Sequence, residues 1–128
     1  MNLTMTRQLV CAALLAACCG CGTGSPVGEV SGRVIYDGKP LKNAEVRMTP
    51  VGEGRQSVGF TDDNGDYYMQ YTLKKPGALI GRHKVTIVVH PQPGDAPIRI
   101  PAEYANGETE FEVRAGNSRL DIDLKSNQ

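Results

Sequence analysis

The chain has 128 residues, enough for one domain, and its 14 basic and 14 acidic residues give a formal net charge of +0. This balance provides no excess of positive charge for binding nucleic acid, so we expect no nucleic-acid partner. Helix formers are sparse, whereas glycine (15 residues) and proline (8 residues) are frequent, which is typical of short strands joined by turns.

The N-terminal segment has the pattern of a lipoprotein signal peptide. An apolar run, LVCAALLAA (residues 9–17), follows a single basic residue, Arg7, and is too short to span a bilayer. The sequence LAAC (residues 15–18) resembles the lipobox of bacterial lipoproteins, in which a leucine and two small residues precede a cysteine that receives a diacylglyceryl group. We therefore expect a signal peptide over residues 1–17, lipidation of Cys18 and anchoring to a membrane.

Other interpretations of the cysteines fit their spacing less well. The chain has four cysteines, Cys11, Cys18, Cys19 and Cys21, so a zinc site would lack a second ligand pair and a disulfide framework would lie outside the domain. An ordinary secretory signal is the main alternative, and Cys21 is a rival lipid acceptor with a poorer match before it. Cys19, rather than aspartate, follows the acceptor, which in some bacteria favours the outer membrane. We expect the periplasmic side of that membrane, and a flexible tether over residues 18–28.

Residues 29–125 are expected to form one domain of short strands. Alternation of apolar and polar residues predicts strands over residues 30–36, 44–49, 58–60, 67–71, 82–90, 109–116 and 118–125. The pair Asp37-Gly38 predicts a tight turn after the first strand, and the proline-rich stretch 91–104 is expected to be extended. Seven strands without a helical period predict an all-β fold, a seven-stranded antiparallel Greek-key sandwich of the prealbumin or immunoglobulin-like kind.

The last two predicted strands are expected to pair as a hairpin around GNSR (residues 116–119). One register places Arg114 opposite Asp121 and Glu110 opposite Lys125, so that unlike charges face one another.

Three stretches carry a family resemblance: GRVIYDGKPLKNAEVRMTP (residues 32–50), TDDNGDYYM (residues 61–69) and PGALIGRHKVTI (residues 76–87). Together they resemble the carboxypeptidase regulatory-like, or transthyretin-like, domain found in small bacterial lipoproteins. The resemblance covers nearly all of residues 29–125 and implies a prealbumin-like sandwich. It implies no activity, because the zinc ligands of carboxypeptidases lie in a catalytic domain that this sequence does not contain.

No motif supplies a nucleophile together with its base, so we expect a protein that is not an enzyme and needs no cofactor. His83 and His90 are seven residues apart on one predicted strand, which places them on opposite faces and prevents a shared metal. We interpret His83 as a strand-edge residue. Some transthyretin-like proteins are hydrolases with a C-terminal Tyr-Arg-Gly-Ser motif, but this chain ends LKSNQ and has no tyrosine after Tyr104.

The segment DDNGD (residues 62–66) begins like a calcium-binding loop, with oxygen ligands at alternate positions. A calcium loop would then need glycine and glutamate where this chain has Tyr67 and Leu73. A turn in which Asn64-Gly65 supplies positive φ angles fits the residues better. A calcium-stabilised adhesion domain is kept as an alternative.

The segment 73–84 is the candidate partner-binding loop, because loops on a rigid sandwich often carry recognition. Its candidate residues combine positive charge with exposed aliphatic groups: Lys74, Lys75, Leu79, Ile80 and Arg82. We expect a non-catalytic, lipid-anchored cell-envelope module that binds or spaces envelope proteins or glycans. A transthyretin-like hydrolase is the less favoured alternative, and the oligomeric state is left open.

Overall fold

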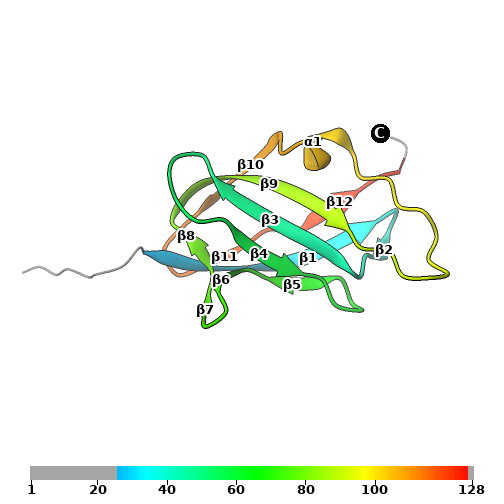
Figure 1. The fold of residues 1–128 in the computed structure, drawn as a ribbon, viewed down its shortest axis with the longest axis horizontal. Coiled ribbons are helices and arrows are strands. Elements are labelled where there is room, and N and C mark those ends of the chain that lie inside the picture. The colour runs from blue at the N-terminus through cyan, green and yellow to red at the C-terminus, as the bar shows by residue number, and fades with distance from the viewer. Residues whose placement is uncertain (1–25, 127–128) are drawn as a thin grey trace, which may run out of the picture.

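The computed structural model describes residues 26–126 and consists of two β-sheets and one short helix (Figure 1). The first sheet contains β1 (Val27–Tyr36), β2 (Lys39–Pro40), β5 (Asp66–Tyr68), β8 (Ala78–Leu79), β11 (Asn117–Arg119) and β12 (Ile122–Leu124). The second contains β3 (Ala44–Pro50), β4 (Ser57–Phe60), β6 (Gln70–Thr72), β7 (Lys75–Pro76), β9 (Gly81–Val89) and β10 (Thr109–Val113). The predicted all-β sandwich is confirmed, whereas the signal peptide, Cys18 and most of the tether lie outside the described residues.

The first sheet is built around β1. Along one edge, β1 pairs antiparallel with β8, β5 and β2 in turn, and along the other edge it pairs parallel with β11 and β12. The sequence of β1 alternates strictly, so Val30 and Val34 point into the interior while Ser31 and Arg33 point to solvent. The turn after β1 has positive φ at both Asp37 (51°) and Gly38 (83°), which confirms the predicted tight turn.

The second sheet is antiparallel and follows the order β10-β9-β3-β4-β6-β7. The long central strand β3 pairs over its whole length with β9, from Ala44 opposite Val89 to Pro50 opposite His83. Side chains from both sheets meet in one apolar core, whose buried members are Val30, Val34, Leu41, Ala44, Val46, Met48, Tyr67, Met69, Ala78, Val85, Ile87, Val113, Ile122 and Leu124. The core holds β4, β5 and β6 in the positions on which the candidate site depends.

The predicted strand 67–71 is divided between the two sheets. β5 pairs with β1 and β6 pairs with β4, so the chain changes sheet at Met69, which is fully buried. The N–H of Met69 donates to the Val30 carbonyl, and the Met69 carbonyl accepts from the N–H of Gly77. These two bonds satisfy the backbone where the regular ladders stop.

The expected hairpin between the last strands is wrong. β10 pairs with β9 in the second sheet, whereas β11 and β12 pair with β1 in the first. The chain crosses between the sheets after Val113, because this separation buries Val113 from one layer and Ile122 from the other in the shared core. Arg114 therefore does not face Asp121, whose carboxylate instead accepts the backbone N–H of Arg33 at 3.0 Å. Lys125 pairs with Asp123 rather than with Glu110.

The proline-rich stretch is not extended throughout. It contains a turn in which the N–H of Asp95 donates to the Gln92 carbonyl, and it ends in a short helix, α1 (Ala102–Ala105), which the sequence did not predict. Pro101 precedes the helix with φ −56°, and its carbonyl accepts the N–H groups of Tyr104 and Ala105. Proline at the start of a helix is favourable because its missing N–H has no intrahelical partner to lose. Tyr104 packs against the core, which fixes the helix beside the second sheet.

Candidate functional site

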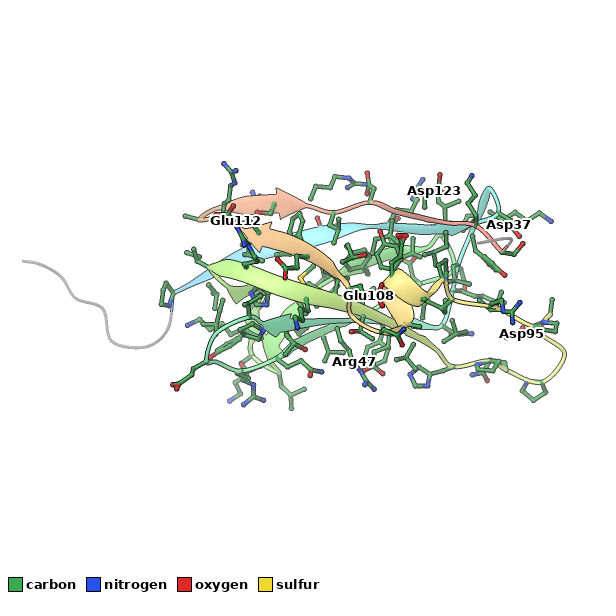
Figure 2. The ribbon with its side chains drawn as sticks, turned by 90° about the horizontal axis from the view of Figure 1, so that it is seen from above. Asp37, Arg47, Asp95, Glu108, Glu112 and Asp123 are labelled. Atoms are coloured by element: carbon green, nitrogen blue, oxygen red, sulfur yellow. The ribbon has the colours of Figure 1, made fainter. Side chains whose placement is uncertain are left out.

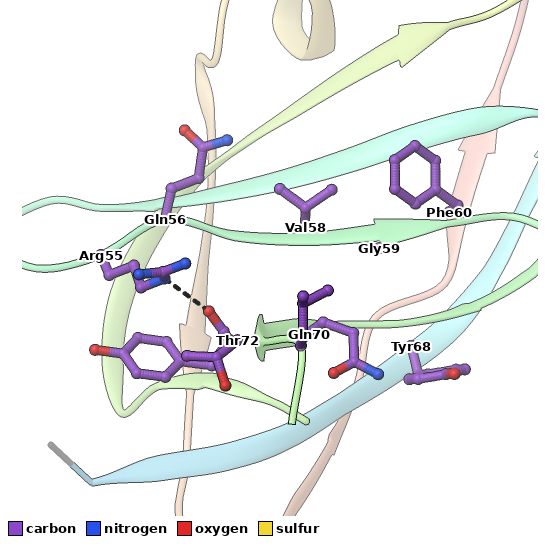
Figure 3. Close-up of a pocket in the computed structure, with 10 residues that line it drawn as sticks. Arg55, Gln56, Val58, Gly59, Phe60, Tyr68, Gln70 and Thr72 are labelled. Atoms are coloured by element: carbon purple, nitrogen blue, oxygen red, sulfur yellow. Dashed lines mark hydrogen bonds between the residues drawn. The ribbon is translucent and has the colours of Figure 1, made fainter. Parts of the chain in front are cut away.

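A groove of about 480 Å³ lies over the outer faces of β4 and β6 and the end of β5. It is lined by Arg55, Gln56, Val58, Gly59, Phe60, Tyr68, Gln70, Tyr71, Thr72 and Leu73. Figure 3 shows Phe60 and Tyr68 at one end of the groove, Arg55 at the other end, and Val58 and Gln70 between them. The groove therefore has an aromatic end, a cationic end and a mixed floor.

The alternation of β4 explains which side chains reach the groove. Ser57 and Gly59 point into the interior, so Val58 and Phe60 point outward. At Gly59 the neighbouring strand comes very close, because a Cβ there would lie 2.5 Å from the Tyr68 carbonyl oxygen. Only glycine permits this approach, which places the chain carrying Tyr68 directly beside Phe60.

Large apolar groups remain exposed around the groove. The exposed fractions are 60% for Phe60, 61% for Tyr68 and 100% for Leu73. Clustered exposed apolar groups in a hollow mark a surface that contacts a ligand or partner. The aromatic end of the groove is therefore the strongest recognition feature among the described residues.

Arg55 closes the other end of the groove. Its Nε donates to the Tyr71 carbonyl oxygen at 2.9 Å, and its guanidinium carbon lies 5.9 Å from the centroid of the Tyr71 ring. The backbone bond and the cation–π contact fix the guanidinium, so its remaining N–H groups stay available at the groove's rim.

The floor of the groove holds an unsatisfied acceptor. The Gln70 amide oxygen is buried and has no hydrogen-bond partner among the described residues. This oxygen is closed off from solvent, so a ligand in the groove can contact the Gln70 side chain but not this acceptor.

A charged cluster on β3 supports the aromatic end. Glu45 is only 8% exposed, and its carboxylate accepts hydrogen bonds from Arg47 and from His90 Nε2, the latter at 2.8 Å. The Arg47 bond, followed by the His90 bond, holds the pKa of Glu45 below its usual value. The His90 ring in turn lies 6.3 Å from the Phe60 ring in a tilted arrangement. This contact helps to orient Phe60.

The predicted partner-binding loop 73–84 is not one loop. Lys74 and Lys75 lie at the β6–β7 turn and are exposed, whereas Leu79 belongs to β8 and is half-buried beside Gly54. Ile80 is 42% exposed at the start of β9, and Arg82 lies 3.6 Å from the Glu110 carboxylate. The five candidate residues thus flank two separate turns, and only Leu73 of this segment lines the groove.

The expected position of His83 at a strand edge is wrong. Its side chain is 1% exposed and lies in β9, which has neighbours on both sides. His83 is in phase with Val85 and Ile87, so the two-residue period turns it inward. Its Nε2 hydrogen-bonds the Leu79 carbonyl oxygen at 2.7 Å. His90 instead hydrogen-bonds the Glu45 carboxylate, so the two histidines share no partner. Across residues 26–126, no three histidine, cysteine or acidic side chains gather as a metal site.

The segment 62–66 forms a turn closed by its own side chains. The Asp62 carboxylate accepts the backbone N–H groups of Asn64 at 2.9 Å and Asp66 at 3.0 Å. Asp66 pairs with Arg33 Nε at 2.8 Å, which lowers the pKa of Asp66. Gly65 adopts φ 78°, as expected, whereas the expected positive φ at Asn64 is wrong, so glycine alone provides the positive φ of this pair. Both carboxylates are thus engaged within the protein.

No protein-family model matches this sequence, and no curated protein sequence matches it. Among solved structures, the chain is similar to a DUF3823 family protein from Parabacteroides merdae, with a TM-score of 0.48 and 14% identity over 79% of this chain. A DUF3823 family protein from Bacteroides ovatus gives a TM-score of 0.46 and 19% identity over 77% of this chain. The matches cover 47% and 44% of those two chains.

The described part of the chain contains one short helix, and no helix there has the length and apolar character needed to cross a bilayer.

Proposed function

We propose that the protein is a non-catalytic, lipid-anchored module of the cell envelope that binds a glycan in the groove over β4, β5 and β6. The observation that carries this proposal is the pairing of two exposed aromatic rings, Phe60 and Tyr68, in a groove whose lining also offers polar side chains. The rings offer flat apolar faces on which the C–H face of a sugar can stack. Arg55, Gln56 and Gln70 line the groove and supply polar groups for sugar hydroxyls.

The lining of the groove favours binding over catalysis. Its ten residues include no aspartate, glutamate, histidine or cysteine. Glycoside hydrolysis usually needs two carboxyl groups beside the bond that breaks, and ester or amide hydrolysis needs a nucleophile with a base. The groove provides stacking surfaces and hydrogen-bonding groups instead, which suit recognition of a neutral or anionic glycan.

The anchor rests on the sequence before the domain. The lipobox-like LAAC (residues 15–18) supports cleavage before Cys18 and its lipidation, and Cys19 supports retention at the outer membrane. Two or three acyl chains on one residue give stable anchoring, whereas a single chain gives only marginal binding. Mass spectrometry of the membrane-extracted protein should find residues 1–17 missing and a diacylglyceryl thioether on Cys18. An unmodified Cys18 would contradict lipid anchoring but would leave the proposal of glycan binding in the groove unaffected.

Binding is tested with purified peptidoglycan and with the oligosaccharide part of lipopolysaccharide as probes. We expect Tyr68→Ala and Phe60→Ala each to weaken binding at least tenfold, and Gln70→Leu to weaken it less. Val51→Ala is the matched control, because it removes an exposed apolar side chain outside the groove. Equal binding by wild type and Tyr68→Ala, or binding to neither probe, would contradict the glycan proposal. Crosslinking in intact cells then reveals whether the same face captures an envelope protein.

A further inference from the structure

We propose that one end of the sandwich docks on the surface of an anionic bilayer and so fixes the orientation of the domain. This inference rests on the proposed anchoring through Cys18. We call this end the tether end, because the described chain begins there at Pro26. Its exposed aliphatic members are Val51, Leu73 and Ile80.

The tether end is assembled from three turns that surround the start of β1. The N–H of Ile80 donates to the Pro26 carbonyl at 3.1 Å, and the N–H of Val51 donates to the Arg82 carbonyl at 2.9 Å. The β6–β7 hairpin returns to the same place, since a Cβ on Gly77 would lie 2.4 Å from the Gly28 carbonyl oxygen. Figure 1 shows β7 and β8 beside the start of β1, while β2 lies at the opposite end.

The exposed aliphatic groups suit a bilayer interface. Leu73 is fully exposed at the tip of the β6–β7 hairpin and is followed directly by Lys74 and Lys75. A leucine beside lysines can enter the acyl boundary while the ammonium groups stay among the lipid headgroups. Val51 and Ile80, which are 51% and 42% exposed, extend the apolar surface at this end.

The charge at the tether end is complementary to anionic headgroups. Its cations outnumber its carboxylates by one: the cations are Arg55, Lys74, Lys75, Arg82 and Arg114, and the carboxylates are Glu29, Glu53, Glu110 and Glu112. Arg82 is partly neutralised by Glu110 at 3.6 Å. The opposite end carries exposed aspartates together with the exposed Lys39 and Lys42, and Figure 2 shows Asp37 and Asp95 both at that end. The bilayer should therefore attract the tether end more strongly than the opposite end.

The length of the tether reinforces this docking. A fully extended chain from Cys18 to Pro26 spans at most about 28 Å. A lipid on Cys18 therefore keeps the tether end close to the headgroups at an effective concentration of about millimolar. Contacts that are individually weak then suffice to hold the domain in one orientation, with the aromatic end of the groove directed away from the bilayer.

The test uses single tryptophans, because the natural chain contains none. Leu73→Trp and Ile80→Trp place a probe at the tether end, and Ala96→Trp places a matched probe at an exposed position on the opposite end. The full lipidated variants are reconstituted in vesicles of phosphatidylglycerol and phosphatidylcholine that contain brominated lipid. We expect a blue shift and at least threefold stronger quenching at positions 73 and 80 than at position 96. Equal quenching at all three positions would overturn the docking proposal.

A charge variant tests the headgroup requirement. Adding Lys74→Ala and Lys75→Ala to the Ile80→Trp variant should reduce the quenching at position 80 to that seen in pure phosphatidylcholine. Lys39→Ala with Lys42→Ala is the control, since both of these lysines are exposed at the opposite end. Loss of quenching in the control as well would point to a general charge effect and would contradict a specific docking end.

Failure of the anchor and failure of docking give different results. Flotation of the wild-type protein with vesicles reports the anchor, and the Cys18→Ala variant should lose it. Docking is then measured without the anchor by titrating Cys18→Ala carrying Leu73→Trp with phosphatidylglycerol vesicles at millimolar lipid. Quenching there supports the docking end even if Cys18 carries no lipid, and its absence overturns docking whatever the state of Cys18.

Discussion

Tyr67 donates its phenolic hydroxyl to the backbone carbonyl oxygen of Leu120, which lies fifty-three residues further along the chain. The bond crosses β1 at Gly32, where a Cβ would lie 1.9 Å from that same carbonyl oxygen and 3.0 Å from the hydroxyl. Because Gly32 has no side chain, Tyr67 on one side of β1 can reach the Leu120 carbonyl on the other side. Burial raises the pKa of Tyr67 well above its ordinary value, so the hydroxyl stays a donor.

Tyr67→Phe should destabilise the fold by about 1–2 kcal/mol, because it leaves the partly buried Leu120 carbonyl without its side-chain donor. Urea denaturation at neutral pH measures the change in the free energy of unfolding. Tyr68→Phe is the control and should change stability by less than about 0.5 kcal/mol, since Tyr68 is largely exposed. Equal losses in the two variants would contradict the structural role of the Tyr67 bond.

Gly32→Ala should be more damaging than Tyr67→Phe. The added methyl group would meet the Leu120 backbone, which cannot move without breaking the pairing of β1 with β11 and β12. We expect a loss of about 3 kcal/mol or more in the free energy of unfolding. Gly52→Ala is the matched control, because a Cβ there has no atom within 4 Å, and it should be neutral or slightly stabilising.

Glu45 should make stability depend on pH. Arg47 and His90 lower the folded-state pKa of Glu45, so its contribution is fully present above the unfolded-state value. That contribution is lost as the pH falls through the depressed folded-state pKa, below the ordinary value of 4.5. Glu45→Gln should therefore cost about 1–2 kcal/mol at pH 7 and progressively less in acid. Glu108→Gln, at an exposed position, should follow the wild-type pH profile.

Calcium should leave the melting temperature unchanged. The Asp62 carboxylate already accepts two backbone N–H groups, and Asp66 is paired with Arg33. Thermal melts with millimolar calcium and with chelator should therefore coincide. A rise of several degrees with calcium would instead favour the calcium-stabilised adhesion domain, and Asp62→Asn should then abolish the rise.

The fold class could be predicted because its signals are local. Alternation placed Val30 and Val34 inside, and the residue types at Asp37-Gly38 determined the turn. The pairing of the last strands could not be predicted in the same way. Matching Arg114 with Asp121 assumed that the last strands belong to the same sheet. In the structure they belong to different sheets, because Val113 and Ile122 are buried in the core from opposite layers.

The groove was missed for a related reason. Alternation already turned Tyr68 and Gln70 away from the core, and two such residues on a solvent face were a usable signal. Their nearness to Phe60 depends on the change of sheet at Met69 and on the close approach at Gly59, both of which are three-dimensional. The same limit explains His83, whose inward direction was readable from its phase with Val85 but whose burial depends on β3 and β10.

The parallel pairing of β1 with β11 and β12 sets the order in which the chain can fold. Residues 29–31 meet residues 117–119, so almost the whole domain must close as one loop before this ladder forms. Such a high contact order predicts folding in milliseconds to seconds rather than microseconds. During synthesis, β1 emerges first and waits with one edge unpaired until the last strands leave the ribosome. The interval before β12 arrives is therefore when the nascent chain is most exposed to aggregation and most in need of a chaperone.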